Sequence, residues 1–155
     1  MSAAVEFRDV DILFPRERGT KGARSLATAL AKLDAGGTRD EISAECGVIL
    51  GVAGGTLSIA PGEICVMMGL SGSGKSTLLR AANGLNPVTR GQVLVADTDG
   101  PIDVARCSAA DLRRLRRLRV AMVFQQFGLL PWRTVAENVG LGLELRGEPP
   151  AERQR

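Results

Sequence analysis

The sequence predicts an α/β fold, and three observations lead to that prediction. Short apolar runs typical of strands alternate along the chain with segments of helical periodicity. A glycine-rich loop joins one of these apolar runs directly to a helix-forming segment, as in the strand–loop–helix units of α/β domains. The chain has 155 residues, 45% of them hydrophobic, which is enough for one domain with a buried core.

The first third of the chain predicts a strand followed by an inserted helical segment. Val5–Ile12 places apolar residues among charges and indicates an edge-type strand. Residues 15–47 differ in character, with a helix predicted over Ala23–Leu33 and a second short helix after Thr38. Thr38 and Glu41 have the spacing of a capping box. Residues 15–47 are too few to bury a core of their own, so we interpret them as an insertion between two strands of one domain.

The middle of the chain predicts a strand–loop–helix unit between further strands. Thr56–Ala60 reads as a short strand, and the apolar run Glu63–Met68 as a buried strand. Lys75–Asn83 contains good helix formers and precedes Gly84, a typical C-cap residue. Gln92–Ala96 indicates another strand.

The last third predicts two capped helices on either side of a buried strand. Ser108–Arg119 is expected to form a helix with Ser108 as N-cap, leucines on one face and arginines on the rest. Val120–Phe124 is expected to be a buried strand. Thr134 and the glutamate three positions later predict a capping box for a helix over Val135–Leu145. Residues 148–155 form a charged tail.

Composition excludes several classes of site. The chain has no histidine, so histidine triads and histidine metal sites are excluded. The three cysteines are scattered without metal-site spacing, as reduced cytosolic thiols are. The N-terminus lacks a signal-peptide pattern, and the longest uncharged run is rich in glycine and contains a proline, so no membrane span is expected. The net charge of +3 is mildly basic and favours anionic partners without naming one.

The glycine-rich loop satisfies the phosphate-binding pattern G-x-x-x-x-G-K-[ST] in full. Its glycines allow successive backbone N–H groups to face phosphate oxygens, its lysine donates to the β- and γ-phosphates, and its first serine after the lysine offers a hydroxyl to Mg²⁺. The helix that follows directs its positive end at the anion. The motif by itself is shared by kinases, GTPases and ATPase motors. The sequence therefore predicts a site for a nucleotide with Mg²⁺ at Gly69, Leu70, Ser71, Gly72, Ser73, Gly74, Lys75, Ser76 and Thr77.

Several segments together resemble the ATP-binding subunits of ATP-binding cassette (ABC) transporters. They are the leader PGE, the loop GLSGSGKST, then LLRAANGLNPVTRGQV and VAMVFQQFGLLPWRTVAENV. Within that group the chain is most similar to the branch that powers import of quaternary amines such as choline, glycine betaine and proline betaine. The resemblance implies a P-loop NTPase fold with a β-rich N-terminal part, and residues 1–155 would be the N-terminal portion of one nucleotide-binding domain.

The resemblance also implies roles for residues outside the phosphate loop. Gln125 matches the glutamine that contacts Mg²⁺, with Gln126 as the alternative for that role, and Phe14 matches the aromatic that stacks on adenine. Residues 126–133 correspond to the surface that receives a helix of the transmembrane permease. The other implied partners are a second ATP-binding subunit in a head-to-tail dimer and, indirectly, a periplasmic or extracellular solute-binding protein. The expected location is the cytoplasmic face of the membrane, peripherally attached.

Motifs of the family's catalytic half do not occur in the 155 residues. We find no LSGGQ-type signature, no Walker B segment with its catalytic carboxylates, and no histidine. We therefore expect this chain to bind Mg-ATP weakly and to hydrolyse it near the background rate, because the catalytic site of the family forms between two subunits. We also expect the chain to be poorly soluble or only marginally stable alone, because it lacks the strands that in the family flank the strand before the phosphate loop.

Two other classes of function remain open from the residues. One is a hydrolysis-deficient nucleotide-binding or regulatory module, or a truncated fragment without function. The other is nucleic-acid binding by the arginine-rich helix, which no interleaved aromatics or nucleic-acid motif support. The simpler interpretation of these side chains is a solvated helix face, in water or beside lipid headgroups or a partner, and no nucleic-acid partner is expected. The arginines are Arg113, Arg114, Arg116, Arg117 and Arg119.

Overall fold

The computed structural model describes residues 3–124 and 128–153. The chain divides into two compact units, unit 1 (Met1–Val120) and unit 2 (Ala121–Arg155). Within the described residues, no helix combines the length and the apolar character that crossing a membrane requires.

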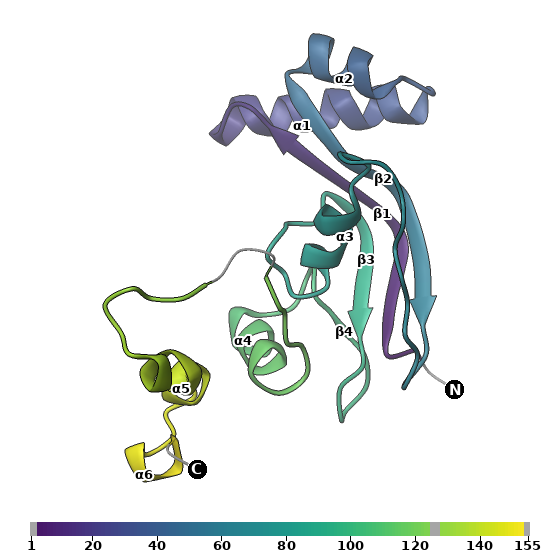
Figure 1. Cartoon of the computed structure of the whole chain (residues 1–155). Coiled ribbons are helices and arrows are strands. Elements are labelled where there is room, and N and C mark those ends of the chain that lie inside the picture. Colours follow the sequence, from purple (N-terminus) through teal and green to yellow (C-terminus); the bar gives the residue numbers. More distant parts are fainter. Residues whose placement is uncertain (1–2, 125–127, 154–155) are drawn as a thin grey trace. The chain divides into compact units, whose positions relative to one another are not determined.

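Unit 1 contains a four-stranded antiparallel sheet with the strand order β2-β1-β3-β4. The strands are β1 (Val5–Pro15), β2 (Val48–Ile59), β3 (Arg90–Val95) and β4 (Ile102–Asp103). The prediction that the first strand is an edge strand is wrong, because β1 lies between β2 and β3 (Figure 1). Two of its charges, Arg8 and Glu6, form an ion pair of 2.7 Å across alternate positions, whereas Asp11 is buried and paired with Arg90 of β3.

The predicted helical segment at residues 15–47 forms two helices, α1 (Gly19–Asp34) and α2 (Arg39–Cys46), at one end of the long β1–β2 pair (Figure 1). The capping box at the start of α2 is confirmed: the Glu41 backbone N–H donates to Thr38 Oγ1 at 3.3 Å and the Thr38 N–H donates to Glu41 Oε2 at 2.8 Å. These helices and strands share one buried cluster, formed by Leu13, Ala29, Ile42, Cys46, Val48 and Leu50. The segment is thus packed onto the sheet by its apolar side chains.

A second buried cluster joins the sheet to α3 (Lys75–Ala81) and α4 (Ala109–Leu118). The helix after the glycine-rich loop ends close to the predicted Gly84, which has φ of 68° and is followed by a Leu85 N–H that donates to the Arg80 carbonyl at 2.9 Å. Ser108 caps α4 as predicted, accepting from the Asp111 N–H at 3.1 Å. The cluster consists of Phe7, Val10, Ile12, Ala81, Ala82, Val93, Val95, Val104 and Leu115.

Two predicted buried strands are absent from the described residues, and these predictions are wrong. Glu63–Met68 and the residues 120–124 have no strand conformation, and Ile64 and Val123 are 90% and 96% exposed. A continuous apolar run predicts a strand covered on both faces, but a strand also needs neighbours to pair its backbone N–H and C=O groups. Within the described part of the chain, the sheet supplies no such neighbour to either segment.

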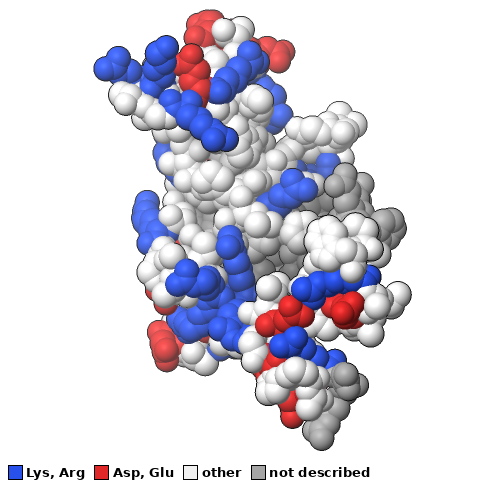
Figure 2. Space-filling view, turned by 90° about the vertical axis from the view of Figure 1, so that its left-hand side faces the viewer, with Lys and Arg blue, Asp and Glu red and all other residues white. Residues whose placement is uncertain are grey.

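The arginines of α4 are not simply a solvated face, which corrects the sequence interpretation. Arg114 and Arg119 both form ion pairs with Asp97, a carboxylate whose side chain is 4% exposed. Arg116 donates to the carbonyl oxygens of Asn83 and Gly84 at 2.7 and 3.0 Å. On the face drawn in Figure 2, basic side chains lie in separate groups with acidic side chains beside several of them. These arginines connect α4 to neighbouring segments, which leaves them less available to a nucleic acid.

Unit 2 contains α5 (Val135–Leu145) and the short α6 (Pro150–Arg153). The predicted capping box of α5 is confirmed, with Thr134 Oγ1 accepting from the Glu137 N–H at 3.3 Å and the Thr134 N–H donating to Glu137 Oε2 at 2.7 Å. Helix α6 was not predicted from the sequence, in which the two prolines and the charges favoured an irregular tail.

Candidate functional site

The glycine-rich loop has a backbone that only glycine adopts without strain at three positions. Gly69, Gly72 and Gly74 have φ of 150°, 79° and 94°. Gly74 is the N-cap of α3, so the loop passes directly into the helix that begins at Lys75. This is the conformation in which a short segment can curl around an anion.

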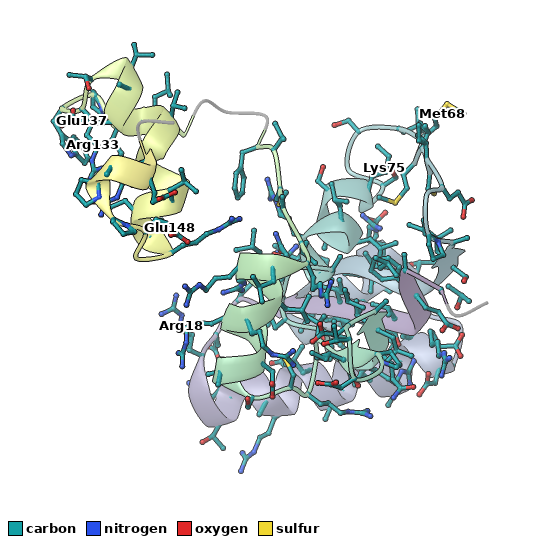
Figure 3. The ribbon with its side chains drawn as sticks, turned by 90° about the horizontal axis from the view of Figure 1, so that it is seen from below. Arg18, Met68, Lys75, Arg133, Glu137 and Glu148 are labelled. Carbon is teal, nitrogen blue, oxygen red and sulfur yellow. The ribbon has the colours of Figure 1, made fainter. Side chains whose placement is uncertain are left out.

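Lys75 is held against the loop by oxygen atoms of the loop itself. Its Nζ donates to the carbonyl oxygens of Gly69 at 2.9 Å and Leu70 at 2.7 Å, and to Ser73 Oγ at 3.1 Å. Figure 3 shows Lys75 below the turn of chain that also carries Met68. The ammonium group is therefore fixed inside the curve of the loop without a carboxylate partner among the described residues.

A pocket of about 300 Å³ lies between the loop and the β1–β2 pair. Its lining contains two cationic side chains, Arg39 and Lys75, and no acidic side chain. Opposite the loop it has an apolar wall from β1 and β2. The complete lining is Phe14, Arg39, Ile49, Leu50, Gly51, Ser71, Gly72, Gly74, Lys75, Ser76 and Thr77. The pocket thus combines positive charge with an apolar surface, which suits a ligand with an anionic and a flat apolar part.

Close packing of two glycines sets the loop against β2. A Cβ atom on Gly74 would overlap the carbonyl oxygen of Gly51. A Cβ atom on Gly51 would lie 2.9 Å from the Phe14 ring and 3.0 Å from the Thr77 methyl group. Glycine at both positions therefore allows the loop, the strand and the Phe14 ring to converge.

The structure places most, but not all, of the predicted residues around this pocket. Phe14, Ser71, Gly72, Gly74, Lys75, Ser76 and Thr77 line it, whereas Gly69, Leu70 and Ser73 belong to the loop without lining it. The Leu70 side chain is 85% exposed. Gln125 and its alternative Gln126 lie outside the described residues.

Four lining residues were not identified from the sequence: Arg39, Ile49, Leu50 and Gly51. Arg39 lies in α2, which belongs to the predicted insertion. The other three lie in the first residues of β2, which belong to the long uncharged run of the sequence. A glycine inside a strand often marks a close backbone approach, so Gly51 carried a usable signal. Arg39 carried none, because only folding brings α2 beside a loop more than thirty residues later in the chain.

The residues present fit a phosphate-bearing ligand with a divalent cation. The positive-φ glycines form the curve, Lys75 supplies charge, and Ser76 is placed in the lining beside it. In the described part of the chain, no group of three or more acidic or cysteine side chains could hold a metal ion by itself. Among the described residues, a cation at this pocket would therefore have the Ser76 hydroxyl as its protein ligand, together with oxygens of the phosphate-bearing ligand.

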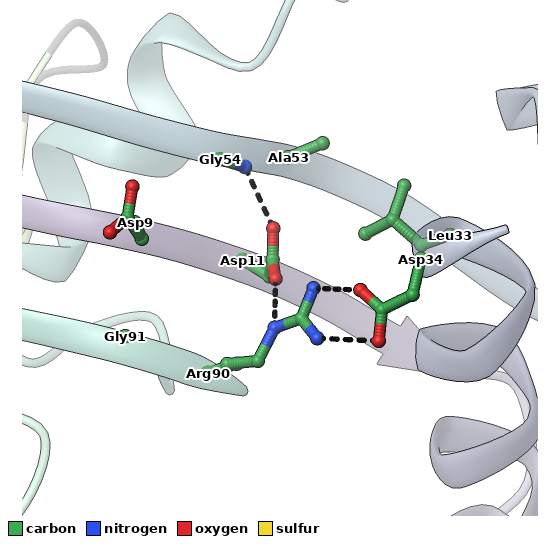
Figure 4. Close-up of a pocket in the computed structure, with 8 residues that line it drawn as sticks. All are labelled: Asp9, Asp11, Leu33, Asp34, Ala53, Gly54, Arg90 and Gly91. Atoms are coloured by element: carbon green, nitrogen blue, oxygen red, sulfur yellow. Dashed lines mark hydrogen bonds and ion pairs between the residues drawn. The ribbon is translucent and has the colours of Figure 1, made fainter. Parts of the chain in front are cut away.

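A second pocket, of about 520 Å³, is lined by an ion network of Asp11, Arg90 and Asp34 (Figure 4). Asp11 is 2% exposed, accepts the Gly54 N–H at 2.7 Å, and pairs with Arg90 Nε at 2.6 Å. Arg90 also pairs with Asp34, the last residue of α1, at 2.7 Å. The hydrogen bond from Arg90 holds the pKa of Asp34 below its usual value. The network fastens α1 to the sheet.

In unit 2, the described part of the predicted permease surface is an ordered loop with exposed apolar side chains. The Asn138 side chain donates to the carbonyl oxygens of Leu130, Arg133 and Thr134 and accepts the Leu130 N–H at 2.8 Å. Leu129 and Trp132 are 66% and 77% exposed. Asn138 was not singled out from the sequence, although an Asn in the first turn of a capped helix is a common way to close the preceding loop.

Comparison with known proteins identifies the family. The model of the family described as ABC transporter matches residues 52–155, more than half of the chain. The chain belongs to the ABC transporter family. This match confirms the resemblance found in the motifs. The fold class is confirmed by two dimeric structures of the ATP-binding cassette MJ0796. The structure bound to ADP and Pi has a TM-score of 0.67 at 27% identity, and the other has a TM-score of 0.68 at 26% identity. Each comparison covers 97% of this chain and 52% of the cassette.

Curated relatives of this ABC chain include ATP-binding proteins of several transport systems. The glycine betaine/proline betaine transport protein ProV of Salmonella typhimurium is 47% identical over 126 residues, which cover 81% of this chain and 30% of the relative. The trimethylamine N-oxide protein TmoW of Ruegeria pomeroyi is 46% identical over 81% of this chain and 36% of the relative. The methionine import protein MetN of Caulobacter vibrioides is 50% identical over 65% of this chain. The chain spans about a third of the length of these relatives.

Proposed function

We propose that this ABC chain binds ATP with Mg²⁺ in the pocket between the phosphate loop and the β1–β2 pair. The observation that carries the proposal is the loop itself, with Lys75 fixed inside the curve of three positive-φ glycines. The loop amides and Lys75 would bind the phosphates, Ser76 would ligate Mg²⁺, and the Phe14 ring would stack on adenine. Gln125 would complete the metal site from the sequence position that matches the family.

We further propose that the whole protein energises import of quaternary amines such as glycine betaine or choline. The ProV proteins support this branch by the extent of the match. A contiguous span of 126 residues in a chain of 155 includes residues 30–126 wherever it starts, and therefore includes α2 of the inserted segment. The MetN match is shorter, at 101 residues, and need not include that segment.

The proposed partners are a transmembrane permease, which would receive residues 126–133, and a second ATP-binding subunit in a head-to-tail dimer. The exposed Trp132 and Leu129 support a protein contact at the described part of this surface, since aromatic and aliphatic side chains of this size favour interface cores. The dimeric state of the MJ0796 cassette supports the second subunit. A solute-binding protein would act through the permease, and the chain would lie at the cytoplasmic face of the membrane.

Hydrolysis is proposed for the assembled transporter, and this chain alone is expected to bind without turnover. The polar side chains of the pocket lining are a lysine, an arginine, two serines and a threonine, and the lining has no carboxylate to act as a general base for water. We expect a steady-state ATPase rate near background for the purified chain, measured by phosphate release. A rate well above background that Lys75→Ala abolishes would contradict this expectation.

Binding of Mg-ATP to the purified chain tests the central proposal. Lys75→Ala should reduce the affinity by at least about tenfold, because it removes the ammonium group that the loop holds among its own oxygen atoms. The matched control is Lys21→Ala on α1, an exposed lysine that does not line the pocket. Calorimetric titration with Mg-ATP should separate the two variants. Equal affinities for Lys75→Ala and the unmodified chain, both with unchanged circular dichroism, would overturn the proposed site.

A further inference from the structure

The phosphate loop has a contact with a residue from the inserted segment. Arg39 is the first residue of α2, and its Nη1 donates to the carbonyl oxygen of Gly72 at 2.8 Å. The two residues are separated by 33 positions in the sequence. Arg39 also lines the pocket that contains Lys75, Ser76 and Thr77. The inserted segment therefore contributes a charged side chain to a site otherwise built from the loop and the β1–β2 pair.

The backbone at Arg39 is held in place by packing and hydrogen bonds of neighbouring residues, and not by contacts of the Arg39 side chain. Thr38 and Glu41 close the capping box that begins α2 directly at Arg39. Ile42, one turn further on, is fully buried against the apolar cluster shared with β1 and β2. On the other side of the turn that precedes α2, Asp34 at the end of α1 is paired with Arg90 of β3. These contacts at two separate places hold the backbone of Arg39 beside the loop.

The charge of Arg39 is not neutralised within the described residues. Its one partner there is the Gly72 carbonyl, which is uncharged, and a guanidinium has five N–H donors. By contrast, Arg90, Arg114 and Arg119 each pair with a carboxylate. The pocket lining carries Arg39 and Lys75 with no acidic residue. Two unbalanced cations facing one pocket favour a ligand with more than one negative charge.

We propose that Arg39 is a nucleotide-contacting residue, with its guanidinium donating to the phosphates of the nucleotide held by the loop. The inference rests on the proposed ATP binding and extends it to a residue outside the phosphate-binding motif. Arg39 stays on the Gly72 carbonyl through one N–H and offers its remaining donors to the anion. Binding then depends on α2, and so on the correct folding of the inserted segment.

A purely structural role for Arg39 gives a different pattern of binding, so the experiment compares nucleotides of different charge. Dissociation constants are measured by calorimetry for Mg-ATP, ADP and adenosine with the unmodified chain, Arg39→Gln and Arg39→Lys. The charge-matched control is Arg24→Gln, an exposed arginine on α1 that does not line the pocket. Thermal melts of each variant verify that the fold is retained.

We expect Arg39→Gln to weaken Mg-ATP binding by roughly tenfold and adenosine binding by less than about twofold, because the lost interaction is between charges. Arg39→Lys should retain most of the ATP affinity, and added salt should shrink the difference between Arg39→Gln and the unmodified chain. Arg24→Gln should match the unmodified chain.

Two results would overturn the inference while leaving ATP binding intact. One is an equal loss for ATP, ADP and adenosine in Arg39→Gln, which would indicate a tether that only shapes the loop. The other is unchanged ATP affinity in Arg39→Gln while Lys75→Ala loses it. Failure of the unmodified chain to bind Mg-ATP at all would instead overturn the proposed function, and the role of Arg39 with it.

Discussion

Individual glycines decide how the phosphate loop meets the rest of unit 1. Gly74 has φ of 94°, and its α-hydrogen faces the carbonyl oxygen of Gly51 with no room for a methyl group. Gly51 in turn leaves room for the Phe14 ring and the Thr77 methyl. The loop can therefore pack closely against β2 only because two positions far apart in the sequence have no side chain.

At the residue scale, Gly74→Ala should damage both stability and binding. A non-glycine residue at this φ costs about 1–3 kcal/mol, and the overlap with the Gly51 carbonyl must also be relieved by moving the loop. We expect a lower midpoint in urea denaturation and loss of Mg-ATP binding in calorimetry.

The matched control for Gly74→Ala is Gly142→Ala in α5, where nothing lies within 4 Å of the new methyl group. Alanine in a helix interior is favoured over glycine by about 0.5–1 kcal/mol, so this variant should be as stable as the unmodified chain or more so. A neutral Gly74→Ala would show that the loop position is not fixed by this contact.

At the scale of elements, α4 is joined to the turn after β3 by a nearly buried carboxylate. Asp97 pairs with Arg114 and Arg119, and the hydrogen bond from Arg119 is the main reason that the pKa of Asp97 lies below its usual value of 3.8. A carboxyl group with a lowered pKa in the folded state stabilises the fold above its unfolded pKa, and this contribution is lost as the pH falls through the folded value.

We therefore expect the stability of the chain to decrease below about pH 4, with Asp97 among the groups responsible. Asp97→Asn should lower stability at neutral pH and reduce the further loss at acidic pH. Urea denaturation between pH 7 and pH 3 measures both. Asp99→Asn, an exposed neighbour two residues away, is the control, and an identical pH profile for Asp97→Asn and the unmodified chain would contradict the assignment.

Asn138 connects two other elements, the loop that carries Trp132 and helix α5. Its amide donates to three carbonyl oxygens and accepts the Leu130 N–H. Asn138→Ala should cost about 1–3 kcal/mol locally, because these loop groups lose their partner. We expect faster hydrogen exchange at the Leu130 amide.

Asn138→Asp distinguishes the hydrogen bond that the Asn138 side chain accepts from the hydrogen bonds that it donates. It keeps an acceptor for the Leu130 N–H but removes the three donated bonds, so the Leu130 amide should stay more protected than in Asn138→Ala. Equal exchange rates in the unmodified chain and Asn138→Ala would show that the loop is held by other contacts.

At the scale of the whole molecule, unit 1 exposes a run of apolar side chains beside its phosphate loop. Ile64, Val66, Met68 and Leu70 are between 71% and 90% exposed. Contiguous exposed apolar residues of this kind favour association with another surface. Most of the run lies in Glu63–Met68, the segment that the sequence predicts as a buried strand. Its side chains are therefore suited to packing against another surface rather than to contact with solvent.

We expect the isolated chain to self-associate through this run. Ile64→Lys combined with Val66→Lys should lower the apparent mass in light scattering toward the monomer, because charges oppose the burial of the run. Leu118→Lys replaces an equally apolar side chain that is 69% exposed on α4 and serves as the control. A monomeric unmodified chain, or an equal effect of Leu118→Lys, would contradict the prediction.

Local signals in the sequence were enough to locate the capped helices and the phosphate loop. Thr38, Ser108 and Thr134 each cap the helix that the sequence predicts, since a cap is a hydrogen bond between residues three positions apart. The loop likewise depends on residues adjacent in the chain. Both could be predicted because the interactions that create them are short in sequence.

Only the tertiary structure decided which strands pair and what else reaches the pocket. The run Glu63–Met68 has the composition of a strand but finds no partner in the described residues, and β1 becomes an inner strand despite its charges. Arg39 arrives at the phosphate loop because α2 packs on β1 and β2. Strand pairing and such long-range contacts depend on which segments the fold brings together. The sequence by itself therefore determined the glycine-rich loop and its phosphate-loop motif, and the fold decided that an arginine from the inserted segment lies beside it.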